Sequence, residues 1–264
     1  MEKLNLSQDS SILPLPAQFG NAPTFVYSAL FGVLPGEIWI DNRDQPSSVL
    51  VSLDMGLYYV GGESQYGDDF IDYLSVKIKE RKQRFTLFSS SLSWNDCLVR
   101  SLDEDLQLIP RLAYQFQPDN VDHPLAAADS ATTGYFIKKI DHETISRSQE
   151  FSEGYYREYW GSISHFEQHG FGYAIVYKEE IVAECTSIFS NKVAAEIDIV
   201  TSPEHRGRGL GLLCAQAFIE EAVKRNATPR WDCHLDNTAS KNMARWLGFV
   251  NPVEYSVLVR KGKK

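Results

Sequence analysis

The chain has 264 residues, of which 43% are hydrophobic and 23% are charged, and its mean hydropathy is -0.28. This length suits two modest domains, and the composition is that of a folded globular protein, which excludes disordered, collagen-like and coiled-coil chains. The net charge of -9 argues against sequence-independent binding to nucleic acid, because such binding needs a basic surface. We therefore expect no nucleic-acid partner.

Neither a membrane span nor a secretion signal is visible in the sequence. No apolar run approaches the roughly 18 residues that would cross a bilayer. The first residues, MEKLNLSQDSS, lack the basic start and apolar segment of a secretory signal. We expect a cytoplasmic protein with no membrane partner.

The four cysteines, Cys97, Cys185, Cys214 and Cys233, are separated by 88, 29 and 19 residues. This spacing matches neither a CxxC zinc pattern nor a compact disulfide framework. We expect reduced, mostly buried cysteines and no metal site.

The first half of the chain alternates between β-like and helical patterns. We expect order to begin near Phe25, after a polar segment that contains Pro14 and Pro16. Runs of β-branched and aromatic residues predict strands, and an apolar stripe at helical spacing predicts a long helix. In chain order, the predicted elements are strands at 37–40, 49–53 and 57–60, a helix at 66–83, a strand at 85–88, a helix at 94–102 and a strand at 106–116.

Residues 117–133 contain two prolines and several acidic residues, so we place the connection between two domains there, with boundaries 1–130 and 131–264. In the second domain, glycines, prolines and hydrophobic periods again separate the elements. The predicted elements are a strand at 134–140, one or two helices in 142–169, strands at 171–177, 181–189 and 193–201, a helix from about 210, a strand at 230–235, a helix at 238–247 and a strand at 253–260.

The two halves repeat one order of elements, which is strands, a long helix, a strand, a short helix and a strand. The first half has ValGlyGlyGluSerGlnTyrGly at 60–67 where the second half has a richer glycine loop. The repetition suggests that the first half is a degenerate copy of the second. All the excess acidity lies in the first half, where residues 1–130 hold nine basic and eighteen acidic residues.

Gly207, Gly209 and Gly211 follow a predicted strand and open a predicted helix. Glycines allow a tight turn, exposed N–H groups point at the ligand, and the helix dipole favours negative charge, so the loop is suited to a phosphate. A dinucleotide-binding loop needs GxGxxG, but Leu212 holds its last position, and no GxxxxGK run is present.

Arg206-x-x-Gly209-x-Gly211 resembles the signature of the GNAT superfamily of acetyl-CoA-dependent N-acyltransferases. The context is similar as well, since Asn237-x-x-Ser240 follows the next strand and Gly248-Phe249 lies eleven residues after Asn237. The resemblance covers residues 133–260. It implies an α/β fold with a mixed, mostly antiparallel sheet flanked by helices, preceded here by a smaller α/β domain.

The same resemblance implies where acetyl-CoA binds. The pyrophosphate would lie on the backbone amides of the glycine loop, the pantetheine arm would pair with the end of the preceding strand, and an asparagine would contact the arm. In this sequence the corresponding residues are Arg206, Gly207, Arg208, Gly209, Leu210 and Gly211 for the loop, Ile199, Val200 and Thr201 for the strand end, and Asn237.

Acetyl transfer to an amine needs a proton acceptor, and Glu196 and Asp198 are the candidates. At i and i+2 on one strand, they share a face, and mutual repulsion would raise one pKa if both were partly buried. The plainer interpretation is that either residue caps a loop or pairs with an arginine. Family members commonly use a Tyr seven residues after the Asn to protonate the leaving thiolate. In this sequence that position holds Ala244, which leaves water or another group such as His234 for this role.

Other motifs have simpler interpretations. His165 and His169 are four residues apart, but Glu167 stands in neither zinc-peptidase order, so we interpret them as a surface helix end. Cys233 and His234 point to opposite faces of a strand, which argues against a nucleophilic pair. Four aromatic residues fall where the family shapes the acceptor pocket, although packing alone also explains them: Tyr155, Tyr156, Tyr159 and Trp160.

The segment 229–240 is also similar to a bacillus-type GNAT subgroup that includes a zwittermicin resistance acetyltransferase. The resemblance as a whole implies an enzyme that transfers acetyl from acetyl-CoA to a primary amine of a small molecule or peptide by direct attack. The alternative is a protein that binds acyl-CoA and has lost turnover. A homodimer is compatible with the sequence, which does not itself set the oligomeric state.

Overall fold

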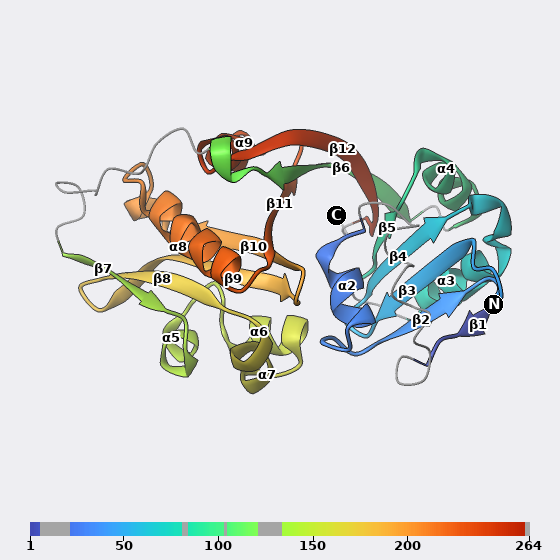
Figure 1. Ribbon diagram of the computed structural model, residues 1–264, viewed down its shortest axis with the longest axis horizontal. Helices are drawn as coiled ribbons and strands as arrows, with labels where there is room; N and C mark the ends of the chain where they lie inside the picture. Colours follow the sequence, from blue (N-terminus) through green and yellow to red (C-terminus); the bar gives the residue numbers. More distant parts are fainter. Residues whose placement is uncertain (6–21, 81–83, 103–104, 121–133, 262–264) are drawn as a thin grey trace. The chain divides into compact units, whose positions relative to one another are not determined.

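The computed structural model describes residues 1–5, 22–80, 84–102, 105–120 and 134–261. The chain forms two compact units (Figure 1): unit 1 comprises Met1–Arg111 and Glu254–Lys264, and unit 2 comprises Leu112–Val253. The last residues of the chain thus return to unit 1, whereas the sequence analysis divided the chain once, after residue 130. Most of the expected connection, residues 121–133, lies outside the described residues.

Unit 1 is a sheet with helices packed against it. Its strands are β1 (Glu2–Lys3), β2 (Gly36–Ile40), β3 (Ser48–Leu53), β4 (Leu57–Gly62), β5 (Thr86–Ser89), the first part of β6 (Leu106–Phe116) and the last part of β12 (Phe249–Arg260). Its helices are α2 (Thr24–Leu30), η2 (Ser64–Tyr66), α3 (Asp68–Glu80) and α4 (Leu92–Ser101). The strand order is β1-β2-β3-β4-β5-β12, in which β4 and β5 are parallel.

Both faces of the unit 1 sheet are apolar. On one face, α3 places Phe70 and Leu74 against Leu50 and Tyr58 in a single buried cluster. Because side chains alternate across a strand, Val51 of β3 lies on the other face, where it is fully buried, on the side of α2. Unit 1 is therefore held together chiefly by hydrophobic burial on both faces of its sheet.

Unit 2 is a second sheet with helices. Its strands are the remainder of β6 and β12 together with β7 (Tyr135–Lys139), β8 (Gly172–Tyr177), β9 (Glu180–Ser190), β10 (Ala194–Thr201) and β11 (Thr228–His234). Its helices are η3 (Pro118–Asn120), α5 (His142–Arg147), α6 (Glu153–Trp160), α7 (Ile163–His169), η4 (Pro203–His205), α8 (Leu210–Lys224) and α9 (Thr238–Trp246). The order β6-β11-β10-β9-β8-β7 is mixed, since β10 and β11 are parallel while the pairs β10–β9, β9–β8 and β8–β7 are antiparallel.

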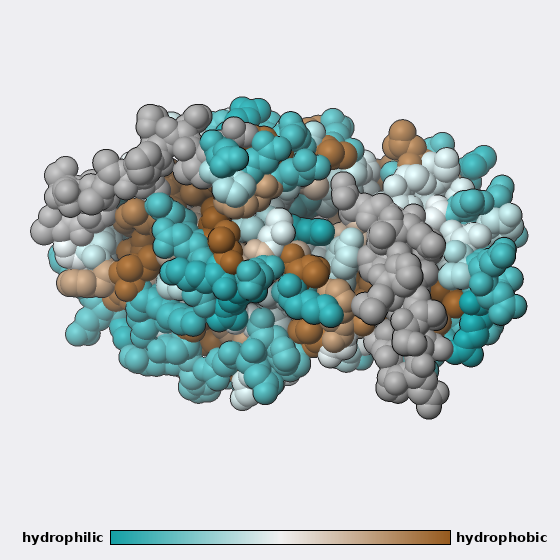
Figure 2. Space-filling model, viewed as in Figure 1, coloured by the Kyte–Doolittle hydropathy of each residue, from teal (hydrophilic) through white to brown (hydrophobic). Residues whose placement is uncertain are grey.

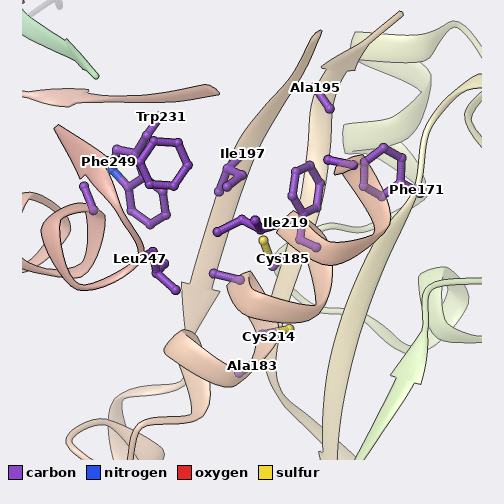
Figure 3. Close-up of a cluster of buried hydrophobic side chains, with 14 of the residues drawn as sticks. Phe171, Ala183, Cys185, Ala195, Ile197, Cys214, Ile219, Trp231, Leu247 and Phe249 are labelled. Carbon is purple, nitrogen blue, oxygen red and sulfur yellow. The ribbon is translucent and has the colours of Figure 1, made fainter. Parts of the chain in front are cut away.

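Helix α8 lies across one face of the unit 2 sheet, and α5, α6 and α7 lie on the other side (Figure 1). The buried stripe of α8 includes Cys214 and Phe218, which join Cys185 and Ile197 from the strands in one hydrophobic core. Figure 3 shows this core, with Trp231 and Phe249 together at one end and Phe171 at the other. This core fixes the position of α8, and hence of the loop that precedes it.

Most predicted elements are present, and three differences are informative. Helix α2 was not predicted, β1 pairs with β2 in the segment expected to be a polar lead-in, and residues 142–169 form three helices rather than one or two. The separation of α6 from α7 has a local cause, because Gly161 ends α6 with a φ of 75°.

Hydrophilic residues cover most of the visible surface in Figure 2, with smaller hydrophobic patches between them. No helix within the described residues is long and apolar enough to cross a membrane. All four cysteines are free, and three of them are buried, as predicted.

Candidate functional site

Strands β10 and β11 run side by side at their starts and then lose their pairing. The ladder joins Ala194, Ala195 and Glu196 to Thr228, Pro229 and Arg230. Beyond Glu196 the described residues form no further ladder pair between these strands, while β10 stays paired to β9 as far as Thr201. The backbone of Ile199, Val200 and Thr201 therefore lacks a strand partner on one edge, which is an arrangement that an extended ligand can pair with.

The glycine loop follows the end of β10 directly. Gly207 has a φ of 73° and Gly209, the N-cap of α8, has a φ of 75°, so both occupy the left-handed region that favours glycine. A Cβ added to either glycine would meet no atom within 4 Å. Within the described chain, the N–H groups of residues 207–212 have no backbone hydrogen-bond acceptor. The loop thus presents a row of donors to an open space at the start of a 15-residue helix.

The loop also carries two arginines, and a hydrogen bond fixes the side chain of each. Arg206 donates from Nε to the carbonyl oxygen of Thr201 at 3.0 Å. Arg208 donates from Nη1 to the hydroxyl of Tyr135 at 2.9 Å, and that hydroxyl lies 3.0 Å from Nδ1 of His205. Sequence reasoning missed Tyr135, because no pattern connects this strand residue to Arg208, which lies 73 positions later.

The first turn of α8 packs closely against the end of β10. A Cβ at Gly211 would lie 3.1 Å from Thr201 Oγ1 and 3.1 Å from Met243 Cε, so only glycine fits there without displacing a neighbour. Leu210 is buried in the core of unit 2, and Ile199 packs against that core. The strand end and the helix start are therefore fixed relative to each other.

The end of β11, the turn after it and α9 contribute residues with clear structural roles. Asn237 is its N-cap and accepts a hydrogen bond at Oδ1 from the Ser240 N–H, at 3.0 Å. His234 accepts the N–H of Asp236 at Nδ1, at 3.1 Å. Ala244 is fully buried in the core. These are structural roles, and the part of Asn237 and His234 in binding or proton transfer stays a prediction.

Asp198 and Glu196 lie on the face of the sheet opposite α8. This follows from alternation, because Ile197 between them belongs to the core beneath α8. Asp198 accepts a hydrogen bond at Oδ2 from the hydroxyl of Tyr155 on α6, at 2.9 Å. Both carboxylates are half-buried. The structure therefore brings Asp198 together with an aromatic residue of the predicted acceptor side.

A third carboxyl, Glu184 of β9, lies on the same face and was not predicted. It is 3% exposed, accepts the Ser148 hydroxyl at 2.7 Å, and pairs across the ladder with Val200, two residues from Asp198. Burial raises the pKa of Glu184 to about 7, with a smaller contribution from the charge of Glu150. One signal was available in the sequence, namely an acidic residue in the middle of the apolar run IVAECTSIF.

Hydrogen bonds, rather than apolar contacts alone, join the α5–α6 segment to the sheet. Besides the bonds to Glu184 and Asp198, the Tyr156 hydroxyl donates to Thr186 Oγ1 at 3.1 Å and Trp160 Nε1 donates to the Ser187 carbonyl at 3.2 Å. The face that holds the carboxylates is therefore polar, partly desolvated and rigidly bordered, which suits the transfer of a proton.

The remaining sequence motifs are the histidine pair of α7 and the neighbouring Cys233 and His234 of β11. His165 and His169 lie on α7 with ring centroids 4.6 Å apart. Among the described residues, no cluster of three or more His, Cys, Asp or Glu side chains could hold a metal ion. Cys233 is buried in the core while His234 is half-exposed, in agreement with the prediction that they face opposite sides of β11.

Comparison with known proteins covers most of the chain. A family model described as GNAT acetyltransferase matches residues 17–258, which is more of the chain than the resemblance at 133–260 covered. The uncharacterized N-acetyltransferase YdfB of Bacillus subtilis is 38% identical over 238 residues, or 89% of each chain.

Two solved structures have a similar fold. A GCN5-related N-acetyltransferase-like protein from Streptococcus suis has a TM-score of 0.71 at 21% identity and covers 97% of this chain and 100% of its own. A tandem GNAT protein from the clavulanic acid biosynthesis pathway has a TM-score of 0.62 at 13% identity and covers 99% of this chain and 98% of its own.

Proposed function

The chain belongs to the GNAT acetyltransferase family, and we propose that unit 2 transfers an acetyl group from acetyl-CoA to a primary amine of a small molecule or peptide. The observation that carries this proposal is the open glycine loop beside the unpaired edge of β10. A diphosphate and an extended arm that bears amides are the ligand chemistry that these two features accept.

The residues present fit acetyl-CoA. The N–H groups of residues 207–212 would hold the pyrophosphate, and Arg206 and Arg208 would add positive charge beside it. Ile199, Val200 and Thr201 would pair with the amides of the pantetheine arm, and Asn237 would contact that arm. When bound, acetyl-CoA supplies an acyl carbon activated as a thioester.

The acceptor side would lie over Asp198, where Tyr155 and the other aromatic residues of α6 border the sheet. An amine must lose a proton before its nitrogen can form a bond, and Asp198 or Glu196 would accept that proton. Glu184 adds a buried carboxyl to the same face. We also propose that unit 1 is a degenerate copy of unit 2, on the ground that both have the order strand, 3-10 turn, long helix and parallel strand.

Calorimetric titration of the purified protein with acetyl-CoA tests the donor, with NAD as a negative control. We expect micromolar binding that Gly209→Trp abolishes, because an indole would occupy the open space in front of the donors. The matched control is Gly32→Trp in unit 1, since Gly32 also has a positive φ, 68°, and open space around its Cβ position. Unchanged affinity in Gly209→Trp would remove this loop from the proposal.

Free thiol release with a panel of amines tests turnover. The panel should include amino acids, polyamines, aminoglycosides, peptide amines and zwittermicin, since the acceptor and the subgroup are both open. Saturable binding without thiol release for any amine would favour the alternative, a protein that binds acyl-CoA without turnover. The buried Ala244 is the observation that favours this alternative, because it offers no proton to a leaving thiolate.

A further inference from the structure

Tyr155 and Asp198 form a contact between two elements that are distant in sequence. The phenol of Tyr155 on α6 donates to Asp198 Oδ2 on β10 at 2.9 Å, across 43 positions of the chain. Asp198 lies two residues beyond Glu196, at which the pairing of β10 with β11 ends. The hydrogen bond therefore reaches the carboxylate next to the unpaired edge of the strand.

Aromatic neighbours hold the Tyr155 ring in place. Its centroid lies 4.7 Å from that of Phe151, 4.7 Å from that of Tyr159 and 5.3 Å from that of Tyr156. Contacts on several sides of a ring restrict its rotamer, so the hydroxyl is directed at Asp198 before any ligand binds.

Tyr155 is the group that carries the proton in this hydrogen bond. Burial raises the pKa of Tyr155 well above its usual value, and the charge of Asp198 and the hydrogen bond between them act in the same direction. The phenol therefore stays protonated and remains a donor across the working pH range. A hydrogen bond given to a carboxylate favours its charged form, so the same contact makes Asp198 less basic.

We propose that Tyr155 is a positioning residue for Asp198, which it holds in the orientation that accepts a proton from the acceptor ammonium. This inference rests on the proposed function. In the step, the proton of the ammonium moves to the Asp198 carboxylate, the nitrogen keeps the electron pair as its lone pair, and Tyr155 keeps its own proton.

The surroundings of the pair matter for its pH dependence. The titratable and charged groups near the pair include Tyr156 and Tyr159 on α6, Glu184 and Cys185 on β9, Glu196 on β10, and Arg230 on β11, which is the ladder partner of Glu196. Tyr155 is a neutral donor on this face, and its hydrogen bond stabilises the charged form of the Asp198 carboxylate.

The test compares Tyr155→Phe with Tyr156→Phe in the full chain. Each substitution removes one phenol hydroxyl from α6, but Tyr156 donates to Thr186 rather than to a carboxylate. With one amine substrate, we expect Tyr155→Phe to move the acidic limb of the kcat profile up by about one pH unit, the size of one hydrogen bond to a charged group. We expect kcat to fall about tenfold while KM for acetyl-CoA stays unchanged, and Tyr156→Phe should leave the limb in place.

A second measurement does not depend on turnover. Carbon-13 NMR of aspartate-labelled protein, with Asp198→Asn to assign the signal, reports the titration midpoint of the Asp198 carboxyl directly. We expect a higher midpoint in Tyr155→Phe and the wild-type midpoint in Tyr156→Phe. Normal amine acetylation with unshifted midpoint and limb in Tyr155→Phe would overturn the role of Tyr155 alone. Absence of acetylation by the wild type with every amine would instead overturn the proposed function, and with it any role of Tyr155 in the reaction.

Discussion

The turn after β4 in unit 1 and the turn after β10 in unit 2 occupy the same place in the order of elements. The space beside the glycines is filled in the first turn and open in the second. In unit 2, added Cβ atoms at Gly207 and Gly209 would meet nothing within 4 Å. In unit 1, a Cβ at Gly67 would lie 2.2 Å from Trp94 Cη2. Trp94 is fully buried, and its Nε1 donates to the Gly62 carbonyl at 2.9 Å. One indole therefore fills in unit 1 the space that stays open in unit 2.

The two turns also differ in charge and in pairing. Asp68 and Asp69 lie in the first turn of α3, where a phosphate would be repelled, whereas Arg206 and Arg208 precede α8. Strand β5 stays paired with β4 as far as Val60 and Ser89, so the opening seen between β10 and β11 has no equivalent at that pair. The comparison teaches that a shared order of elements does not make a shared site, because the site depends on what fills the turn.

The largest expected effect is on stability, and it comes from Trp94→Ala, which removes the indole that packs against the turn after β4. Removing a fully buried indole leaves a cavity and takes one hydrogen bond from the Gly62 carbonyl, and such changes cost about 3–5 kcal/mol of unfolding free energy. Urea unfolding followed by circular dichroism measures the loss. Trp246→Ala, at a site 56% exposed, is the control and should cost under about 1 kcal/mol.

The affinity for acetyl-CoA should be the same in Trp94→Ala and in wild type, because Trp94 belongs to unit 1. Gly67→Ala reaches the same contact from the other side and should destabilise by about 1–3 kcal/mol through overpacking against the indole. A loss below about 1 kcal/mol in both variants would contradict the interpretation of Trp94 as the residue that fills this turn.

The faces of the sheets opposite α3 and α8 differ in a second way. In unit 1 this face carries Val51, whereas in unit 2 it carries Glu184 and Asp198. A raised pKa means that the folded protein binds a proton at Glu184 between about pH 4.5 and 7, where the unfolded chain has released it. The unfolding free energy therefore falls as the pH rises through this window and levels off above it.

Glu184→Gln should remove this dependence, because an amide keeps an acceptor for Ser148 without a charge. We expect the variant to be more stable than wild type at pH 8, by an amount up to about 3 kcal/mol, and nearly equal to it at pH 5. Thermal and urea unfolding at the two pH values measure the difference. Glu180→Gln, on the same strand but exposed, should behave as wild type at both. Equal stability of Glu184→Gln and wild type at pH 8 would contradict a desolvated carboxyl.

The strand, glycine loop and helix of the candidate site in unit 2 could be predicted because their signals are local. Gly207, Gly209 and Gly211 are recognised by their spacing alone. Glycine is also the residue that most readily adopts a positive φ, as Gly207 and Gly209 do. Glu196 and Asp198 follow from period-2 alternation in one strand. The structure confirms the strand that this alternation requires, since both residues lie in β10 (Ala194–Thr201).

What escaped prediction depends on contacts between distant residues. Helix α2 has the sequence TFVYSAL, whose β-branched and aromatic residues favour strands, and it is stabilised by burial of Phe25, Val26 and Ala29. The high pKa of Glu184 depends on its burial beside Ser148, which is 36 positions away. Trp94 gave no signal that it would fill a turn more than 25 residues earlier. Such effects are set by tertiary packing, which a linear pattern does not contain.

The smallest expected effect on stability, and the sharpest test of the open loop, is Gly207→Ala. Because an added Cβ at this position meets nothing within 4 Å, only the left-handed backbone opposes the change, at a cost of about 1–2 kcal/mol. Gly32→Ala in unit 1 has the same open surroundings and a φ of 68°, so it should cost the same in urea unfolding. The two variants should then separate in calorimetry, since a shifted backbone at Gly207 misdirects the N–H donors and weakens acetyl-CoA binding about tenfold, while Gly32→Ala leaves it unchanged. Equal acetyl-CoA affinities in the two variants would mean that the conformation at Gly207 serves the turn alone, and the contrast between the units would then rest on Trp94 and on charge.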